Sequence, residues 1–146
     1  MKYSQESIYR FLCEIDDLFV PPLSEKQELL SFSKKIYLKA TVCAEVVDSR
    51  IVSAVIGYTD NLIDNSAYIS VVATLVDHYG HGYASKLINQ FVDICSEKKI
   101  DSVHLYTTKN NIKAQRMYER LEFVRFFPEN EQRRNDIHYI KYLGRR

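Results

Sequence analysis

The feature that most constrains this chain is a pair of closely spaced glycines, Gly80 and Gly82, between an apolar and an amphipathic segment. Residues 67–76 before them are almost continuously apolar and rich in β-branched side chains, which predicts a strand buried on both faces. The segment after them carries apolar residues at helical spacing: Ala84, Leu87, Ile88, Phe91, Val92 and Cys95. Glycines at such a junction let the main chain turn sharply and let a ligand reach helix N–H groups without intrahelical partners. We therefore expect residues 79–84, hereafter the glycine loop, to bind a pyrophosphate.

Two other phosphate-binding loops do not fit these residues. A Walker A loop requires Lys and then Ser or Thr after its second glycine, whereas Gly82 is followed by Tyr83 and Ala84. A dinucleotide-binding loop requires Gly or Ala three residues after the second glycine, where this chain has Ser85. It also requires an acidic residue at the end of the next strand, whereas Asp101 lies before that strand. Both alternatives are therefore excluded.

Length and composition predict one domain, residues 1–146, because 146 residues that are 46% hydrophobic can build a substantial core. The formal charge of +1 is too balanced for a nucleic-acid or membrane binder, so we expect small-molecule partners. Cys13, Cys43 and Cys95 lie far apart, which argues against disulfides and a zinc site. We find neither a signal-like N-terminus nor an uncharged run of ~20 residues and expect a cytoplasmic protein without a metal. The sequence leaves open whether the chain forms a homodimer.

The segment before the glycine loop predicts two helices and a β-hairpin. The first helix begins after a Ser4 cap and buries a stripe at i, i+3, i+4 and i+7: Ile8, Phe11, Leu12 and Ile15. Ser24 and Gln27 have the spacing of a capping box that opens the second helix. That helix is expected to face the core with Leu29, Leu30, Ile36 and Tyr37. Strands at 41–47 and 51–58 flank a polar turn, which favours a hairpin.

The segment after the glycine helix predicts a strand, a helix and two final strands. Residues 102–108 alternate, with His104 and Tyr106 on one face and Leu105 on the other. The next helix spans about residues 111–121 with a common stripe formed by Ala114, Met117, Tyr118 and Leu121. Strands are expected at 122–127 and 136–143, around a polar loop at 128–135. This order predicts an α/β fold with a mixed sheet and helices on both faces.

The stretch at residues 110–123 is the second informative motif. It resembles a signature of the GNAT superfamily of N-acetyltransferases, Asn-x-x-Ala-x-x-x-Tyr followed by a charged residue, Leu and Gly-Phe. The matching residues are Asn111, Ala114, Tyr118, Leu121 and Phe123, and Glu122 replaces the usual glycine. The glycine loop is similar to the other GNAT signature, Gln/Arg-x-x-Gly-x-Gly/Ala, with Tyr79 in place of Gln or Arg. The two motifs together cover roughly half of the chain, about residues 67–127.

The resemblance implies a GNAT-like, mostly antiparallel sheet and an N-acetyltransferase that uses acetyl-CoA. The implied pyrophosphate site consists of Tyr79, Gly80, His81, Gly82, Tyr83, Ala84 and Ser85. The implied pantetheine site is the edge of the central strand, at Val72, Ala73, Thr74 and Leu75. A neutral amine would attack the thioester directly, Tyr118 would donate a proton to the departing thiolate, and Asn111 would contact the cofactor. The implied acceptor is a small molecule or peptide with a primary amine.

Each of these residues also has a structural interpretation. Tyr118 lies on an apolar stripe, where a half-buried tyrosine is a common core residue. Asn111 caps a helix in the structural interpretation, contacts the cofactor in the functional one, and is able to do both. His81 is either exposed or a weak cation near phosphate. The two glycines are either a ligand site or a plain turn.

The sequence does not select a general base or a substrate. His104 and Tyr106 project from one face of the strand expected beside the cofactor cleft, and Glu45 and Tyr68 come from strands expected to line the acceptor side. An amine of near-normal pKa needs only a water-mediated proton path, so a dedicated base is not required. Three functions stay open at this point. The first is acetyl transfer, the second is an acyl-CoA-binding regulatory module without turnover, and the third is an interaction domain without a ligand.

Overall fold

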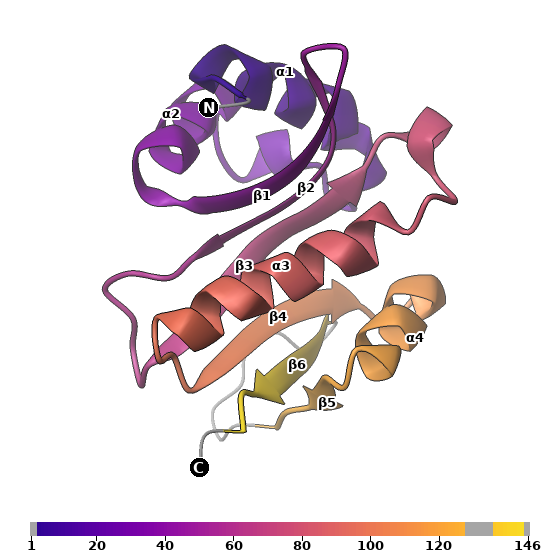
Figure 1. Cartoon of the computed structure of the whole chain (residues 1–146). Coiled ribbons are helices and arrows are strands. Elements are labelled where there is room, and N and C mark those ends of the chain that lie inside the picture. Colours follow the sequence, from indigo (N-terminus) through magenta and orange to yellow (C-terminus); the bar gives the residue numbers. More distant parts are fainter. Residues whose placement is uncertain (1–2, 128–135, 145–146) are drawn as a thin grey trace. The chain divides into compact units, whose positions relative to one another are not determined.

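The structure, a computed structural model, describes residues 3–127 and 136–144 (Figure 1). Its main elements, in chain order, are α1 (Gln5–Ile15), α2 (Leu29–Lys39), β1 (Thr41–Val47), β2 (Arg50–Tyr58), β3 (Ser66–Thr74), α3 (Tyr83–Glu97), β4 (Ser102–Thr108), α4 (Ile112–Arg120), β5 (Val124–Arg125) and β6 (Asp136–Tyr142). The chain divides into two compact units, of which the first comprises Met1–Tyr58 and Ser70–Phe91 and the second Thr59–Ile69 and Val92–Arg146. Both β3 and α3 contribute residues to each unit.

The strands follow the order β1-β2-β3-β4-β6-β5. The β3–β4 pair is parallel, whereas β1–β2, β4–β6 and β5–β6 are antiparallel. This confirms the predicted mixed, mostly antiparallel sheet. The predicted loop at 128–135 lies outside the described residues. No helix in the described parts of the chain is long and apolar enough to span a membrane.

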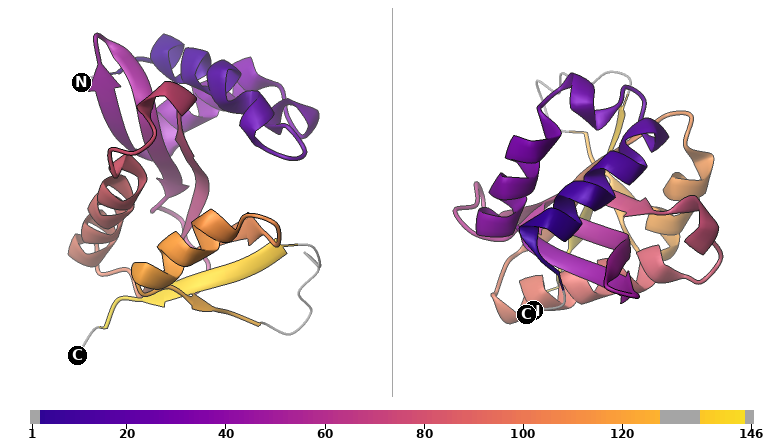
Figure 2. Two further views of the ribbon diagram at one scale, coloured as in Figure 1. Left: turned by 90° about the vertical axis from the view of Figure 1, so that its right-hand side faces the viewer. Right: turned by 90° about the horizontal axis from the view of Figure 1, so that it is seen from above.

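The core of the first unit forms between the helical pair and the hairpin. The Ser4 hydroxyl caps α1, and the predicted stripe of Ile8, Phe11, Leu12 and Ile15 is buried. These side chains pack with Phe32 and Ile36 of α2 and with Ala54 and Ile56 of β2. In Figure 2, α1 and α2 cover one side of the hairpin and the N-terminal part of α3 the other. As a result, β2 is buried on both faces: Ala54 and Ile56 on one face and Ser53 and Val55 on the other are all inaccessible to solvent.

The start of α2 differs from the prediction. Glu28 caps it, because its carboxylate accepts hydrogen bonds from the N–H groups of Leu30 and Ser31 at 3.2 Å each. Ser24 instead donates its N–H and hydroxyl to the Asp16 carboxylate, at 2.8 and 2.6 Å. The predicted core face was also partly wrong, since Leu30 and Tyr37 are 52% and 39% exposed. The buried side chains of α2 are Phe32, Ser33 and Ile36.

The hairpin forms where predicted, and both residues of its turn have left-handed backbone conformations. Asp48 and Ser49 have φ angles of 51° and 65°, which suit a two-residue hairpin turn.

The prediction that the strand before the glycine loop, β3, is buried on both faces was wrong. In β3 the inward residues Ala67, Ile69 and Val71 are buried, whereas the alternating residues are half-buried. The strand ends at Thr74, so Val76 of the predicted strand is exposed.

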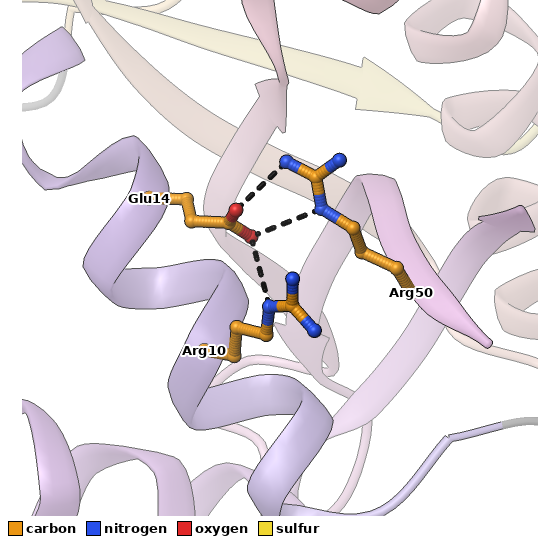
Figure 3. Close-up of polar contacts among 3 residues, drawn as sticks. All are labelled: Arg10, Glu14 and Arg50. Carbon is orange, nitrogen blue, oxygen red and sulfur yellow. Dashed lines mark hydrogen bonds and ion pairs between the residues drawn. The ribbon is translucent and has the colours of Figure 1, made fainter. Parts of the chain in front are cut away.

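A shared carboxylate joins α1 to the beginning of β2 in the first unit (Figure 3). The Arg50 guanidinium donates to both oxygens of Glu14, with N–O distances of 2.7 and 3.5 Å. The Arg10 side chain lies 4.0 Å from the same carboxylate. Glu14 and Arg50 are about one-quarter to one-third exposed, so the bidentate pair is the stronger of the two contacts.

The second unit places α4 against one face of β6. Tyr118 of α4 packs against Tyr139, and the Tyr139 hydroxyl donates to Glu119 at 2.8 Å. The Lys141 ammonium donates to the Leu121 carbonyl at 2.7 Å. Since Tyr139 and Lys141 share one face by alternation, His138 and Ile140 lie on the other. The predicted strand at 122–127 is reduced to Val124–Arg125.

Candidate active site

The glycine loop leads from β3 into α3 through a short 3-10 helix at Val76–His78. Gly80 and Gly82 have φ angles of 87° and 71°, a region that favours glycine. The helix then begins at Tyr83, and the N–H groups of its first turn have no acceptor within the helix. The first helical hydrogen bond runs from the Lys86 N–H to the Gly82 carbonyl at 3.2 Å. The loop therefore has the conformation of an anion-binding helix start.

The space beside both glycines is open. A Cβ added at Gly80 or Gly82 would meet no described atom within 4 Å. His81 is exposed and stacks on Tyr83, with ring centroids 5.2 Å apart, while Tyr79 is 49% exposed. Ala84 and Ser85 are half-buried in the first turn of α3. A phosphate group fits beside these residues, because the space on the Cβ side of both glycines is open.

The end of β3 is held in place from β2. The Ser53 hydroxyl, fully buried, lies 2.7 Å from the Thr74 hydroxyl and donates to the Ala73 carbonyl at 3.2 Å. The Leu75 N–H donates to the Val52 carbonyl at 2.8 Å. These bonds fix one edge of the predicted pantetheine site, in which Val72, Ala73 and Thr74 are half-buried and Leu75 is buried.

The ladder between β3 and β4 is short. It comprises three residue pairs, Ser66 with Ser102, Ala67 with Val103, and Tyr68 with His104. The remaining residues of β3, 69–74, lie outside this ladder. These residues include the predicted pantetheine site at 72–74.

Tyr118 lies in the second unit and is almost completely buried. Its ring is 5% exposed and packs against Tyr139 and Phe123, at centroid distances of 5.7 and 6.0 Å. Burial, and secondarily the nearby Tyr139, raise the pKa of Tyr118 far above its ordinary value. The hydroxyl is therefore protonated at neutral pH. Both the core interpretation and the proton-donor interpretation agree with this environment.

The C-terminal end of α4 holds Tyr118 in place. The N–H of Phe123 donates to the Tyr118 carbonyl at 2.9 Å, and the N–H of Glu122 donates to the main-chain carbonyl of Glu119 at 3.1 Å. With Glu122 at a φ of 70°, these bonds form a Schellman motif. The ring contact between Phe123 and Tyr118 supplies its hydrophobic pair. Glu122 thus adopts the glycine-like conformation that its position in the signature requires.

The N-terminal end of α4 is capped by Asn111, whose side-chain oxygen accepts the Ala114 N–H at 3.1 Å. This confirms the capping role, while the cofactor contact stays a prediction. Gln115 was not predicted from the sequence. It is 7% exposed, and its amide nitrogen donates to the carbonyls of Thr108 and Lys109 at 3.1 and 3.0 Å. A polar residue on a helix gives no sequence signal for such a role.

Three of the four candidate bases come together in the second unit, on one face of β3 and β4. Tyr68 packs against His104 and Tyr106, at centroid distances of 5.1 and 6.3 Å. Glu45 belongs to the first unit and forms an ion pair with Lys86 at 2.8 Å. His138, which was not singled out from the sequence, lies with its Nε2 2.8 Å from the His104 Nδ1. Alternation along the last strand places His138 on one face of the sheet. Its contact with His104 also depends on the register of β6 against β4, which the sequence does not give.

The described residues contain no group of three or more His, Cys, Asp or Glu side chains arranged to hold a metal ion. Cys13 is exposed, Cys43 and Cys95 are buried, and all three are free thiols. The arrangement thus supplies an anion site, a buried phenol and a group of imidazole and phenol rings.

Residues 9–123 match the sequence profile of the acetyltransferase (GNAT) family. None of the curated protein sequences compared with the chain matches it. Solved structures share its fold over nearly the whole length. The ribosomal-protein-S18-alanine N-acetyltransferase from Escherichia coli is 15% identical with a TM-score of 0.74, covering 97% of this chain and 89% of that one.

Two further structures show the same similarity. The PaiA N-acetyltransferase from Thermoplasma acidophilum, in complex with coenzyme A, is 14% identical with a TM-score of 0.74, covering 97% of this chain and 96% of that one. An aminoglycoside 6'-acetyltransferase type Ii is 13% identical with a TM-score of 0.74, covering 97% and 91%. At these identities the likeness establishes the fold.

Proposed function

Because this chain belongs to the acetyltransferase (GNAT) family, whose members are acetyl-CoA-dependent N-acetyltransferases, we propose that it transfers an acetyl group to a primary amine of a small molecule or peptide. The observation that carries the proposal is the glycine loop. Its two left-handed glycines open onto free space directly before the N–H groups of α3. A helix start of this kind is suited to the pyrophosphate of CoA.

In this proposal the main chain at 79–85 holds the pyrophosphate, and the edge of β3 at 72–75 pairs with the amides of pantetheine. The Ser53 hydroxyl, which donates to the Ala73 carbonyl, and the Val52 carbonyl, which accepts the Leu75 N–H, hold that edge in place. His81, exposed beside the loop, adds a weak cation near the phosphates. Asn111 serves as both cap and cofactor contact.

Tyr118 is proposed as the proton donor to the sulfur that leaves. Its buried hydroxyl keeps its proton at neutral pH, which suits donation to a thiolate. The Schellman motif at the end of α4 fixes the tyrosine by its carbonyl and its ring. A donor that acts on the departing sulfur stabilises mainly the transition state.

The structurally similar proteins do not identify the acceptor of this chain, because they act on different substrates. One acts on an alanine of a ribosomal protein and another on aminoglycosides, and their TM-scores to this chain are both 0.74. A primary amine is the acceptor chemistry that the proposal retains. We further infer a cytoplasmic location, which the three free thiols support because reducing conditions preserve them.

Two measurements test the proposed function. Isothermal titration with CoA is expected to show one site per chain, and its absence would favour an interaction domain without a ligand. An amine panel with acetyl-CoA, followed by release of free thiol, is expected to identify at least one acceptor. Binding of CoA without thiol release across the panel would instead favour a regulatory module.

A further inference from the structure

Lys86 is the only lysine or arginine between Arg50 and Lys98, a stretch that includes β3, the glycine loop and α3. It is the fourth residue of α3, and its N–H donates to the Gly82 carbonyl at 3.2 Å. A cation near the start of a helix is disfavoured, because the helix dipole places partial positive charge there. Helix stability therefore does not account for a lysine at this position.

The helix directs the Lys86 side chain toward the glycine loop. In an α-helix each Cα–Cβ bond tilts toward the N-terminus, and residues four positions apart lie on one face. Lys86 and Gly82 are such a pair, and four residues of helix rise by about 6 Å. A lysine stem of four methylene groups is of similar length. The ammonium is thus able to reach the level of Gly82, where the phosphate is proposed to bind.

A carboxylate from β1 holds this ammonium in the first unit. The Lys86 Nζ donates to Glu45 Oε1 at 2.8 Å. Glu45 pairs with Ser53 across the hairpin, and the Ser53 hydroxyl bonds to the end of β3, so three strands position the carboxylate. The Lys86 side chain is 53% exposed, and an ion pair this exposed contributes little to stability. An anion that arrives from solvent can therefore compete with Glu45 for the ammonium.

The glycine loop has no excess of positive charge of its own. Residues 75–85 contain one acid, Asp77, and two histidines, His78 and His81. Lys86 is therefore the one permanent cation that residues 75–86 can offer to a phosphate. A charge-assisted hydrogen bond to a phosphate oxygen is stronger than one between neutral groups. Because main-chain N–H groups of the loop would hold the phosphate at the same time, a bound phosphate has the advantage over Glu45.

We propose that Lys86 exchanges the Glu45 carboxylate for the pyrophosphate of CoA when the cofactor binds, and returns to Glu45 when CoA leaves. The inference rests on the proposed function and adds a side-chain ligand to a site built from main-chain N–H groups. Glu45 acts as the competitor: it keeps the ammonium beside the loop in the free protein and weakens CoA binding by the strength of the ion pair. Such a competitor favours release of the product CoA, and product release limits turnover in many enzymes.

Isothermal titration with CoA, and with dephospho-CoA, which lacks the 3'-phosphate, tests the exchange. The variants are Lys86→Met, Lys86→Arg, Glu45→Gln, and Lys86→Met combined with Glu45→Gln. The matched controls are Lys98→Met and Asp60→Asn, because Lys98 and Asp60 form an ion pair of the same 2.8 Å length just after the end of α3. Thermal unfolding verifies that each variant is folded, and Lys86→Gln replaces Lys86→Met if the latter does not fold.

Lys86→Met is expected to weaken the binding of both ligands about 10-fold, and Lys86→Arg to retain affinity within about threefold. The loss in Lys86→Met should shrink in about 1 M salt, where charges are screened. Glu45→Gln should tighten the binding of both ligands by about two- to fivefold, which corresponds to the strength of an exposed ion pair. In the double variant this gain should vanish, because no ammonium remains for Glu45 to withhold. The controls should bind like the unsubstituted chain.

Wild-type affinity in Lys86→Met, or a loss confined to CoA, would overturn the contact with the pyrophosphate. A gain from Glu45→Gln that persists without Lys86 would indicate long-range repulsion in place of exchange and would overturn the proposal. Equal changes in the controls would do the same. In all these outcomes the unsubstituted chain binds CoA and the proposed function stands. Absence of CoA binding by the unsubstituted chain would overturn the proposed function, and the role of Lys86 with it.

Discussion

At the residue scale, burial decides the chemistry of Tyr118. A phenolate in this position would lose its hydration without gaining a cation, so the neutral hydroxyl is favoured and the pKa of Tyr118 rises. The hydroxyl keeps its proton in the folded state above the ordinary tyrosine pKa of about 10, whereas the unfolded chain loses it. Stability from this group is complete below about pH 10 and is lost as the pH rises further.

Replacing Tyr118 with Phe separates its two interpretations. The ring stays against Tyr139 and Phe123, and only the hydroxyl is removed. If the hydroxyl assists the departing thiolate, kcat and kcat/KM should fall together by on the order of 10- to 1,000-fold, with little change in KM for acetyl-CoA. If Tyr118 is only a core residue, unfolding should cost about 1 kcal/mol less and turnover should persist. Steady-state kinetics and thermal unfolding of the same variant distinguish these outcomes.

The cysteines differ in reactivity because their burial differs. Burial raises the pKa of the Cys43 thiol to about 11, and the thiolate is the form that iodoacetamide attacks. We expect labelling of exposed Cys13 in the native protein near pH 8, with Cys43 and Cys95 modified only after unfolding. Mass spectrometry of tryptic peptides reads out the order. Early labelling of Cys43 would contradict the burial of β1 against the core.

At the element scale, the glycine loop is tested by adding side chains to it. A side chain at Gly82 meets no described atom, so Gly82→Val mainly strains the main chain and fills the space proposed for phosphate. We expect a folded protein, with a stability cost of about 1–2 kcal/mol from the left-handed φ, and no CoA binding by titration calorimetry.

The matched control for the glycine loop is Gly144→Val, which also places a side chain at a positive φ, of 62°, after the last strand. It should carry a similar strain and retain CoA affinity. Unchanged CoA affinity in Gly82→Val would remove the glycine loop from the cofactor site.

The C-terminal turn of α4 is strained by Glu122, whose φ is 70°. Replacing Glu122 with Gly should stabilise the protein by about 1 kcal/mol, because glycine adopts this conformation without a Cβ clash. The ion pair with Lys141 that is lost has an N–O distance of 3.8 Å, and the Glu122 side chain is 86% exposed, so its contribution is small. Chemical denaturation measures the free energy of unfolding of both proteins. A lower value for Glu122→Gly would contradict the strain assigned to Glu122.

Most elements were predictable from local patterns, and the failures have physical causes. The apolar stripe of α1 and the alternation of β4 match the structure because periodicity alone sets which face is buried. The start of α2 was misassigned because both Ser and Glu side chains offer oxygen atoms that can cap a helix. The Asp16 carboxylate that binds Ser24 lies eight positions before it, outside the spacing of a capping box. The apolar runs of β2 and β3 could not show that β2 is buried on both faces and β3 on one.

The site was predictable to the extent that backbone geometry and sequence motifs coincide. Gly80 and Gly82 indicated a sharp turn, which the structure forms with two left-handed residues, and Asn111 indicated a possible cap, which it forms. His138 could not be identified, because its contact with His104 depends on the register of two strands that are 34 positions apart at this contact. Long-range register is set by the whole core rather than by neighbouring residues.

At the scale of the whole molecule, β3 and α3 supply residues to both compact units. We expect one cooperative unfolding transition, because neither unit can unfold without disrupting an element that the other uses. CoA at 100 times its Kd should raise the free energy of unfolding by about 2.7 kcal/mol and the Tm by roughly 5–11 °C. Scanning calorimetry tests both expectations. Two resolved transitions, or an unchanged Tm with CoA, would contradict them.

The carboxylate that Arg10 and Arg50 share has a consequence for how this sequence is able to diverge. Loss of Arg10 leaves Glu14 with the 2.7 Å contact to Arg50, so position 10 is free to drift. Loss of Glu14 removes the carboxylate that the two guanidiniums share and both hydrogen bonds that Arg50 donates to it, so positions 14 and 50 are constrained to change together (Figure 3). Among descendants of this chain, substitutions should accumulate at position 10 and appear at positions 14 and 50 only as compensated pairs.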